Sequence, residues 1–252
     1  MKASQVVPPL VLAILFLAAW QIAAATGFLA DTLGLDPLLV PSPSEIASSL
    51  YEDRAVLAEN ALVTLWEVLA GFALALVVGV GAAVLLHLHE PLRRATYPLV
   101  VASQTIPVIV IAPILVVWFG YGIGPKLAVI ALICFFPIAV NTLDGLRSVP
   151  VPLVEMMRTL DARRSRILAD VELPASLPYL FSGAKIAVAV AVIGAVFGEW
   201  VGASSGLGYL MLQDNAQLET ARLFASVFLL SVIALVLFGT VALLERLSIR
   251  WR

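Results

Sequence analysis

Residues 223–244 read LFASVFLLSVIALVLFGTVALL and contain no charged side chain between Arg222 and Glu245. A helix needs about 20 mainly apolar residues to cross a hydrocarbon core about 30 Å thick, so this stretch is long enough to span a membrane. The rest of the chain has a similar composition. Apolar residues make up 62% of its 252 residues, charged residues 13%, and the mean hydropathy is +1.04. Because soluble domains carry about 25% charged residues, the composition excludes a conventional water-soluble enzyme and predicts a membrane protein.

Five further apolar runs precede this one and complete the predicted architecture. They indicate an all-α polytopic membrane protein, one transmembrane domain over residues 1–252, with six spans. The spans are expected at roughly 8–25, 62–88, 97–119, 125–146, 178–201 and 222–245. Within the fifth run, Lys185 is expected to reach the membrane surface with its ammonium group. The first run also resembles a signal peptide that ends at Ala23-Ala24-Ala25, but its length favours an uncleaved span.

The distribution of basic residues predicts the orientation, because loops rich in lysine and arginine stay on the cytoplasmic side. With a cytoplasmic N-terminus, the outer segments hold only Arg54, Lys126 and Arg222 among the basic residues, against eight of the chain's 17 acidic residues. The inner segments hold Lys2, Arg93, Arg94, Arg147, Arg158, Arg163, Arg164, Arg166, Arg246, Arg250 and Arg252. We therefore expect both termini in the cytoplasm. The net charge of −2 is too small to suggest a nucleic-acid partner. In the long outer segment 26–61, Ser44 is expected to cap a short helix with Glu45 in its first turn.

The longest inner segment, which we call loop 147–177, is the most polar and most basic part of the chain. Val154, Met157 and Leu160 recur at helical spacing, and the pattern repeats from Ser165 to Leu173, so the loop is predicted to form two short helices. Pro174 and Pro178 are expected to end the second helix and to restart the chain as the fifth span. An ordered loop of this length usually binds something. Two readings stay open: an amphipathic loop that lies on lipid headgroups, and a docking element for a cytoplasmic protein.

A family resemblance supports the docking reading. Glu155-Met156-Met157, then Asp161, then Leu173-Pro174 resembles the "EAA" loop of the permeases of binding-protein-dependent ABC importers. This sequence departs from the family pattern in two places. Met156 and Met157 replace alanines but keep high helix propensity. Asp161 replaces a glycine that often serves a turn with positive φ, a conformation that aspartate tolerates better than most residues.

Further motifs extend the resemblance over nearly the whole chain. Pro41-Ser42-Pro43-Ser44-Glu45 and Thr105-Ile106-Pro107 are typical of the nitrate, sulfonate and taurine branch of the family. Gly198-Glu199-Trp200-Val201-Gly202, followed by Ser205-Gly206-Leu207-Gly208-Tyr209, resembles the hydroxymethylpyrimidine and riboflavin permeases within that branch.

The resemblance implies a set of partners and a location. It implies a multi-pass protein of the bacterial cytoplasmic membrane that pairs with a second copy of itself and lies in membrane lipid. Two cytoplasmic ATPase subunits are expected to bind ATP and Mg²⁺, and an extracytoplasmic binding protein is expected to deliver the solute. The residues expected to couple the permease to the ATPases are Glu155, Met156, Met157, Arg158, Asp161, Arg163, Arg164, Leu173 and Pro174.

The chain is not expected to be an enzyme or to bind a cofactor or metal itself. A phosphate-binding loop requires G-x-x-x-x-G-K-[ST], and in Gly120–Lys126 the residue before the lysine is Pro125 and the residue after it is Leu127. His87 and His89 are the only histidines, and residues two apart on a helix do not face the same way. Cys134 is expected to be a small packing residue.

Small and polar residues within the spans suggest packing and pathway positions. Five glycines at intervals of four or eight are expected to allow close helix packing, within the chain or between two copies: Gly71, Gly79, Gly194, Gly198 and Gly202. Polar or aromatic residues in spans are candidates for the solute pathway, although interhelical hydrogen bonds use the same residue types: Gln104, Thr105, Asn141, Glu199 and Trp200. Glu199 is expected at the outer end of the fifth span, as a gate or as an interfacial anchor.

Two other functions are alternatives to an ABC permease, and more than one class of solute fits the sequence. An ion-coupled secondary transporter should show internal repeats or paired charges within spans, and neither is evident in the sequence. A membrane enzyme should show a convergent acid–base or metal cluster. The acidic outer segments argue against a permanently anionic solute, and aromatic residues near the outer ends of the spans suit a flat heterocycle. We therefore expect a pyrimidine or a related heterocycle, with sulfonate, taurine or nitrate as the alternative.

Overall fold

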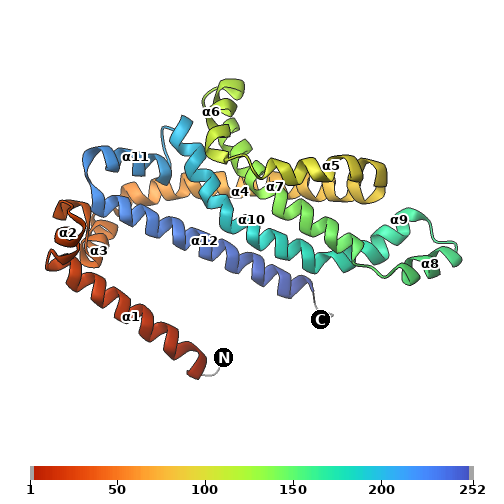
Figure 1. The fold of residues 1–252 in the computed structure, drawn as a ribbon, viewed down its shortest axis with the longest axis horizontal. Coiled ribbons are helices and arrows are strands. Elements are labelled where there is room, and N and C mark those ends of the chain that lie inside the picture. The colour runs from red at the N-terminus through yellow and green to blue at the C-terminus, as the bar shows by residue number, and fades with distance from the viewer. Residues whose placement is uncertain (1–2, 250–252) are drawn as a thin grey trace. The chain divides into compact units, whose positions relative to one another are not determined.

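A computed structural model describes residues 3–249, and all the regular structure in this range is helical (Figure 1). The predicted all-α fold is therefore confirmed. In chain order the helices are α1 (Ala3–Ala25), α2 (Phe28–Leu33), η1 (Pro37–Leu39), α3 (Pro43–Glu52), α4 (Arg54–Leu88), α5 (Glu90–Ser103), α6 (Val108–Phe119), α7 (Ile123–Arg147), α8 (Val151–Thr159), α9 (Arg164–Ile167), η2 (Leu168–Glu172), α10 (Leu173–Gly202), α11 (Leu207–Gln217) and α12 (Thr220–Ser248).

Within the described residues, five helical segments are long and apolar enough to cross a membrane. They contain α1, α4, α7, α10 and α12, which correspond to the first, second, fourth, fifth and sixth predicted spans. Helix α4 begins eight residues before the predicted span and has 35 residues. At 1.5 Å per residue it is about 50 Å long, well beyond the apolar core of a bilayer.

The third predicted span is not one continuous helix. Helices α5 and α6 cover residues 90–119, but they are bent by 104° at a break between Ser103 and Val108 (Figure 1). The third predicted span, over 97–119, therefore corresponds to this bent pair and not to one straight helix. Pro107 explains the break, because proline lacks an N–H donor and forces the residue before it out of the helical conformation. The backbone N–H groups of Gln104 and Thr105 instead close short turns onto Val101 and Ala102.

The described residues divide into two compact units. One contains residues 3–62 with 205–230, and the other contains residues 63–204 with 231–249. In the second unit, α7 is packed against both α4 and α10. Gly71 of α4 lies so close to Ile130 of α7 that a Cβ atom at Gly71 would be 2.6 Å from the Ile130 Cβ. On α10, a Cβ at Gly198 would be 3.1 Å from the Lys126 Cα of α7. These contacts bring the helix backbones together, as small residues do in membrane proteins.

In the first unit, α3 begins with a complete capping box. Ser42, and not the predicted Ser44, is the N-cap: its hydroxyl accepts a hydrogen bond from the Glu45 N–H at 3.3 Å. The Glu45 carboxylate in turn accepts from the Ser42 N–H at 2.6 Å. Pro43 at the first helical position explains the shift, since its fixed φ suits that position and its missing N–H is not needed there. Later in the same unit, Arg222 forms an ion pair with the buried Asp214 at 2.6 Å.

The second part of loop 147–177 continues directly into α10. Helix α9 is followed without interruption by the π-helical turn η2 and then by α10, so Arg164–Gly202 forms one helical segment. The prediction that Pro174 and Pro178 separate the loop from the fifth span was wrong. In a regular α-helix a proline ring clashes with the carbonyl four residues earlier. For Pro174 that residue is Asp170, which lies inside the wider π-helical turn.

Candidate functional site

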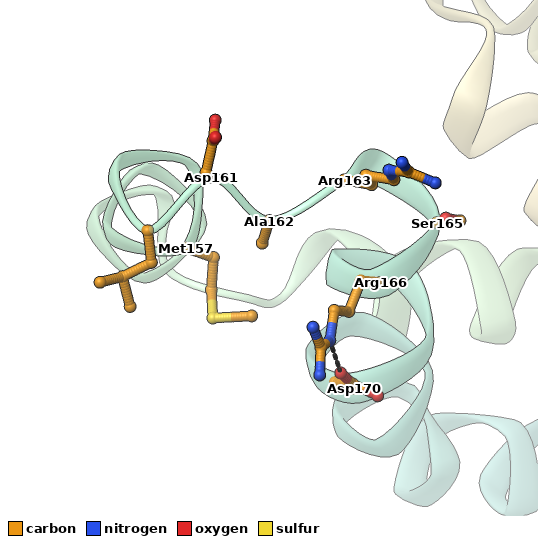
Figure 2. Close-up of a pocket in the computed structure, with 8 residues that line it drawn as sticks. Met157, Asp161, Ala162, Arg163, Ser165, Arg166 and Asp170 are labelled. Atoms are coloured by element: carbon orange, nitrogen blue, oxygen red, sulfur yellow. Dashed lines mark hydrogen bonds and ion pairs between the residues drawn. The ribbon is translucent and has the colours of Figure 1, made fainter.

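The most distinctive surface of the loop is an open pocket of about 670 Å³ at the turn between α8 and α9 (Figure 2). Figure 2 shows Met157 on the α8 side of the pocket and the side chain of Asp161 directed away from the turn. On the other side, Arg166 pairs with Asp170 at 3.4 Å. The residues that line the pocket are Met157, Leu160, Asp161, Ala162, Arg163, Ser165, Arg166 and Asp170.

Asp161 forms the turn itself. Its φ is +62°, in the left-handed region, which is the conformation expected where the related permeases carry glycine. Two backbone hydrogen bonds close the turn: the Asp161 N–H donates to the Arg158 carbonyl at 3.0 Å, and the Ala162 N–H donates to the Met157 carbonyl at 3.0 Å. Aspartate adopts this conformation at a lower cost than most residues, so the loop keeps its turn without glycine.

Helix α8 has no buried residue. Several of its apolar side chains are exposed: Met156 is 51% exposed and Leu160, just after the helix, is 71% exposed. Among the residues that the structure describes, Glu155 and Arg158 are exposed and form no ion pair within the chain. A short amphipathic helix with exposed methionine and leucine beside free charges has the composition of a protein-binding surface.

Not every predicted loop residue belongs to this surface. Arg164 turns toward its own chain: its Nη1 donates to Glu172 Oε2 at 2.5 Å, and its Nη2 lies 2.9 Å from His87 Nε2. Leu173 packs against the core cluster of Ala83, Leu143 and Leu146. Nothing in the sequence indicated a role for Glu172, and His87 was considered only as a metal ligand. The two residues meet in the fold although they are far apart in the chain, so no local sequence pattern could indicate their contact.

The pathway candidates occupy three different environments. Gln104 and Thr105 lie in the break between α5 and α6, and both are exposed. Asn141 is half-buried and donates to the Pro137 carbonyl of its own helix at 2.7 Å. Trp200 is 38% exposed and makes an edge-on contact with Phe197, with 5.7 Å between ring centroids. The structure therefore does not bring the five candidates together into one site.

Glu199 faces the inside of its own helical bundle. It is 1% exposed, and its Oε1 accepts a hydrogen bond from the Thr64 hydroxyl at 2.6 Å. Glu199 lies near the end of α10, as expected for the end of the fifth span, but its side chain is buried and not exposed. The reason is the close packing around Gly198, which places α10 against α7 and leaves its neighbour Glu199 covered by α4.

Charged pairs are present where none was evident in the sequence. Lys126 donates to Glu67 Oε1 at 2.6 Å, and both side chains are buried. Lys185, which was expected to reach the membrane surface alone, donates to Glu245 Oε2 at 2.7 Å. The partners are 59 and 60 residues apart in the chain, which is why the apolar runs gave no sign of either pair. The buried pair Glu67–Lys126 joins α4 to α7, and the half-buried pair Lys185–Glu245 joins α10 to α12. Removal of one member of the buried pair would leave an uncompensated charge.

The five predicted packing glycines lie against other helices of the same chain. Gly71, Gly79, Gly194 and Gly198 contact residues of α7, and Gly202 contacts Val116 of α6.

The chain is similar in sequence to permease proteins of several transport systems. The chain is 38% identical over its whole length to the formylaminopyrimidine transport permease protein ThiX of Halalkalibacterium halodurans, of which it covers 98%. It is 36% identical to the riboflavin transport system permease protein RibX of Chloroflexus aurantiacus, across 86% of this chain and 82% of that protein. It is 28% identical to the putative aliphatic sulfonates transport permease protein SsuC of Bacillus subtilis, across 96% and 87%.

Solved structures support the fold. A chain from an inward-facing crystal structure of the MetNI methionine ABC transporter superposes with a TM-score of 0.67 at 23% identity, covering 78% of this chain and 98% of that one. The family model of the binding-protein-dependent transport system inner membrane component matches residues 75–250. This chain therefore belongs to the family of binding-protein-dependent transport system inner membrane components, the multi-pass membrane permeases of ABC transporters.

Proposed function

We propose that this chain forms the solute pathway of an ATP-driven importer and receives its ATPase at loop 147–177. One observation carries the proposal: α8 buries none of its residues, and it presents Met156 and Leu160 beside the pocket around Asp161. A membrane protein has little reason to hold an ordered amphipathic helix outside its bundle unless another molecule covers it. The free charges of Glu155 and Arg158 supply electrostatic complementarity to such a partner.

The proposed assembly follows from the family. Two copies of this chain pair in the bacterial cytoplasmic membrane, with both termini in the cytoplasm, in contact with lipid. Two cytoplasmic ATPase subunits bind ATP and Mg²⁺ and contact loop 147–177, and an extracytoplasmic protein delivers the solute. The excess of arginine in the loop supports its cytoplasmic position. Movement of the ATPases would then be transmitted to the helical bundle as a rigid-body displacement.

The proposed solute is a small heterocycle such as a pyrimidine. The names of two relatives, which refer to formylaminopyrimidine and riboflavin, support this choice. The alternative is a sulfonate, taurine or nitrate, and the relative named for aliphatic sulfonates supports it at lower identity. Calorimetric titration of the partner binding protein with both groups of compounds distinguishes them. Tight binding of a pyrimidine is expected, and tight binding of a sulfonate or nitrate alone would overturn the choice.

The docking surface is tested by reversing one charge. The Glu155→Lys variant changes an exposed residue that makes no ion pair within the described chain, so the fold is expected to persist. The ATPase subunit is then expected to be lost during co-purification. Glu59→Lys is the matched control, because Glu59 is also an exposed glutamate on a helix but lies on the predicted outer side. If Glu155→Lys retains the ATPase and shows normal solute-stimulated ATP turnover, the proposed docking surface is wrong.

A further inference from the structure

Glu172 stands out because it is a carboxylate buried outside the proposed docking surface. It is the last residue of the π-helical turn η2, and only 4% of the residue is exposed. A buried carboxylate is costly unless charged and hydrogen-bonding partners compensate it. Two partners do so here. Arg164 Nη1 lies 2.5 Å from Glu172 Oε2, and His87 Nε2 lies 3.0 Å from the same oxygen.

The ion pair of Arg164 and Glu172 links the two ends of the π-helical turn. Arg164 is the first residue of α9, before the turn, and Glu172 is its last residue, so the ion pair reaches across the whole turn. A π-helical turn interrupts the regular hydrogen bonding of a helix and occurs frequently at functional sites. Because Arg164–Gly202 is one helical segment, α9 is joined to α10 through this turn without a break in the helix.

His87 links this ion pair to a different helix, α4. It lies one residue before the end of α4, 77 residues from Arg164 along the chain. Its Nε2 atom is 2.9 Å from Arg164 Nη2 and 3.0 Å from Glu172 Oε2. A ring nitrogen without a proton accepts from arginine, whereas one with a proton donates to carboxylate. His87 Nε2 therefore bonds to one of these two partners at a time.

We propose that His87, Arg164 and Glu172 form a latch that transmits movement of loop 147–177 to α4 as well as to α10. His87 bonds to Arg164 in one state of the loop and to Glu172 in the other, and the exchange of partners accompanies the movement. The three are positioning residues, which act through the helices they join and not on the solute. This inference rests on the proposed function, since it requires an ATPase that moves the loop.

The test measures coupling separately from assembly. Wild type and variants are reconstituted with the ATPase and the binding protein, and two quantities are measured: ATPase retained on co-purification, and ATP hydrolysed per solute taken up. Four variants separate the contributions of Glu172 and His87. Glu172→Gln keeps the shape of the side chain and removes its charge. His87→Phe keeps a ring and removes its hydrogen bonds, and it leaves the buried carboxylate paired with Arg164. His87→Gln keeps both an acceptor and a donor. His89→Phe is the matched control, since His89 is exposed just after the end of the same helix and its ring lies within hydrogen-bond distance of the Leu85 carbonyl of that helix.

All variants are expected to retain the ATPase. Glu172→Gln and His87→Phe are expected to raise the ATP hydrolysed per solute roughly 5-fold or more, the lower end of usual coupling between sites. His87→Gln and His89→Phe are expected to stay at the wild-type ratio. A wild-type ratio in both Glu172→Gln and His87→Phe, with the ATPase bound, would overturn the latch. If His87→Gln behaved like His87→Phe, the exchange of partners would be wrong. Failure of the wild-type chain to bind any ATPase would contradict the proposed function instead.

Discussion

At the scale of single residues, Asp161 forms a turn in a backbone conformation that usually favours glycine. Its left-handed backbone conformation closes the turn between α8 and α9. For an L-residue this conformation costs about 1–2 kcal/mol. Aspartate is among the few non-glycine residues that visit it routinely. The pocket and the exposed face of α8 meet at this turn, so its stability determines whether the proposed docking surface is preformed.

Substitutions at Asp161 test this role. Asp161→Val is expected to destabilise the turn by about 1–2 kcal/mol, because a β-branched side chain disfavours positive φ. Trypsin cleavage at the neighbouring Arg158 and Arg163 is then expected to accelerate by roughly 5- to 30-fold, the factor that this free energy represents. Asp161→Gly is the matched control and is expected to be cleaved at the wild-type rate or more slowly. Equal cleavage of the valine and glycine variants would contradict the turn's dependence on positive φ.

The capping box of α3 predicts a pH dependence. The hydrogen bond from the Ser42 N–H, followed by that from the Ser42 hydroxyl, lowers the pKa of Glu45. A carboxyl group whose pKa is lower in the folded state contributes stability above its unfolded pKa. That contribution is lost as the pH falls below about 4.

Hydrogen exchange measures this effect directly. After correction for intrinsic exchange rates, protection of the amides in residues 43–52 is expected to fall as the pH drops below about 4. Glu45→Gln serves as the control, because glutamine still accepts from the Ser42 N–H but does not titrate. The decrease attributed to Glu45 is expected to disappear in this variant. An identical pH profile in both proteins would show that another group is responsible.

At the scale of helices, α7 and α10 approach each other closely. A Cβ atom at Gly183 of α10 would lie 2.4 Å from the Pro137 carbonyl oxygen and 2.9 Å from the Asn141 Cβ, both on α7. Backbone atoms cannot move aside as the end of a flexible side chain can. The two helices therefore leave no room for a side chain at Gly183.

An alanine at this position tests the packing. Gly183→Ala is expected to destabilise the protein by about 1–3 kcal/mol, the usual cost of overpacking, and to lower the thermal unfolding midpoint in detergent. Gly81→Ala is the matched control, because nothing lies within 4 Å of a Cβ atom there. Since alanine favours helix over glycine, Gly81→Ala is expected to keep or raise the midpoint. Equal midpoints for the two variants would contradict the close approach of α7 and α10.

Sequence reasoning succeeded for the helices whose signal is local. Long apolar runs predicted α1, α4, α7, α10 and α12 because hydrophobic length is a property of each segment alone. It failed at the break before Pro107 and at the continuous helix through Pro174. Proline can break a helix, but it is also tolerated in the first turn of one. Which of the two occurs depends on the backbone conformation around the proline. At Pro174 the π-helical turn that precedes it settles the choice.

At the scale of the whole molecule, side chains that meet across helices could not be predicted. The pairs Glu67–Lys126 and Lys185–Glu245, and the contact of His87 with Glu172, join segments that are far apart in the sequence. Asp161, by contrast, was identified from its position within a family motif and then found with positive φ. Motif spacing therefore located the loop, whereas the network that ties the loop to the bundle required the structure.

The two charge pairs that join helices, Glu67–Lys126 and Lys185–Glu245, bear on the mechanism of transport. Paired charges within spans are a feature of ion-coupled transporters. Here each pair joins two helices of one chain, and the family of the chain is that of ABC permeases. The pairs thus support the integrity of the bundle, and the energy for transport is expected to come from a separate ATPase.

Uptake into proteoliposomes tests whether ATP hydrolysis by a separate subunit drives transport through this chain. The purified chain is reconstituted alone with an imposed proton or sodium gradient, and in parallel with its ATPase, its binding protein and ATP. Uptake of the solute is expected only in the complete system with hydrolysable ATP. The proton and sodium gradients are expected to drive no uptake by the chain alone. Uptake by the chain alone under a gradient, at a rate similar to that of the complete system, would contradict the account.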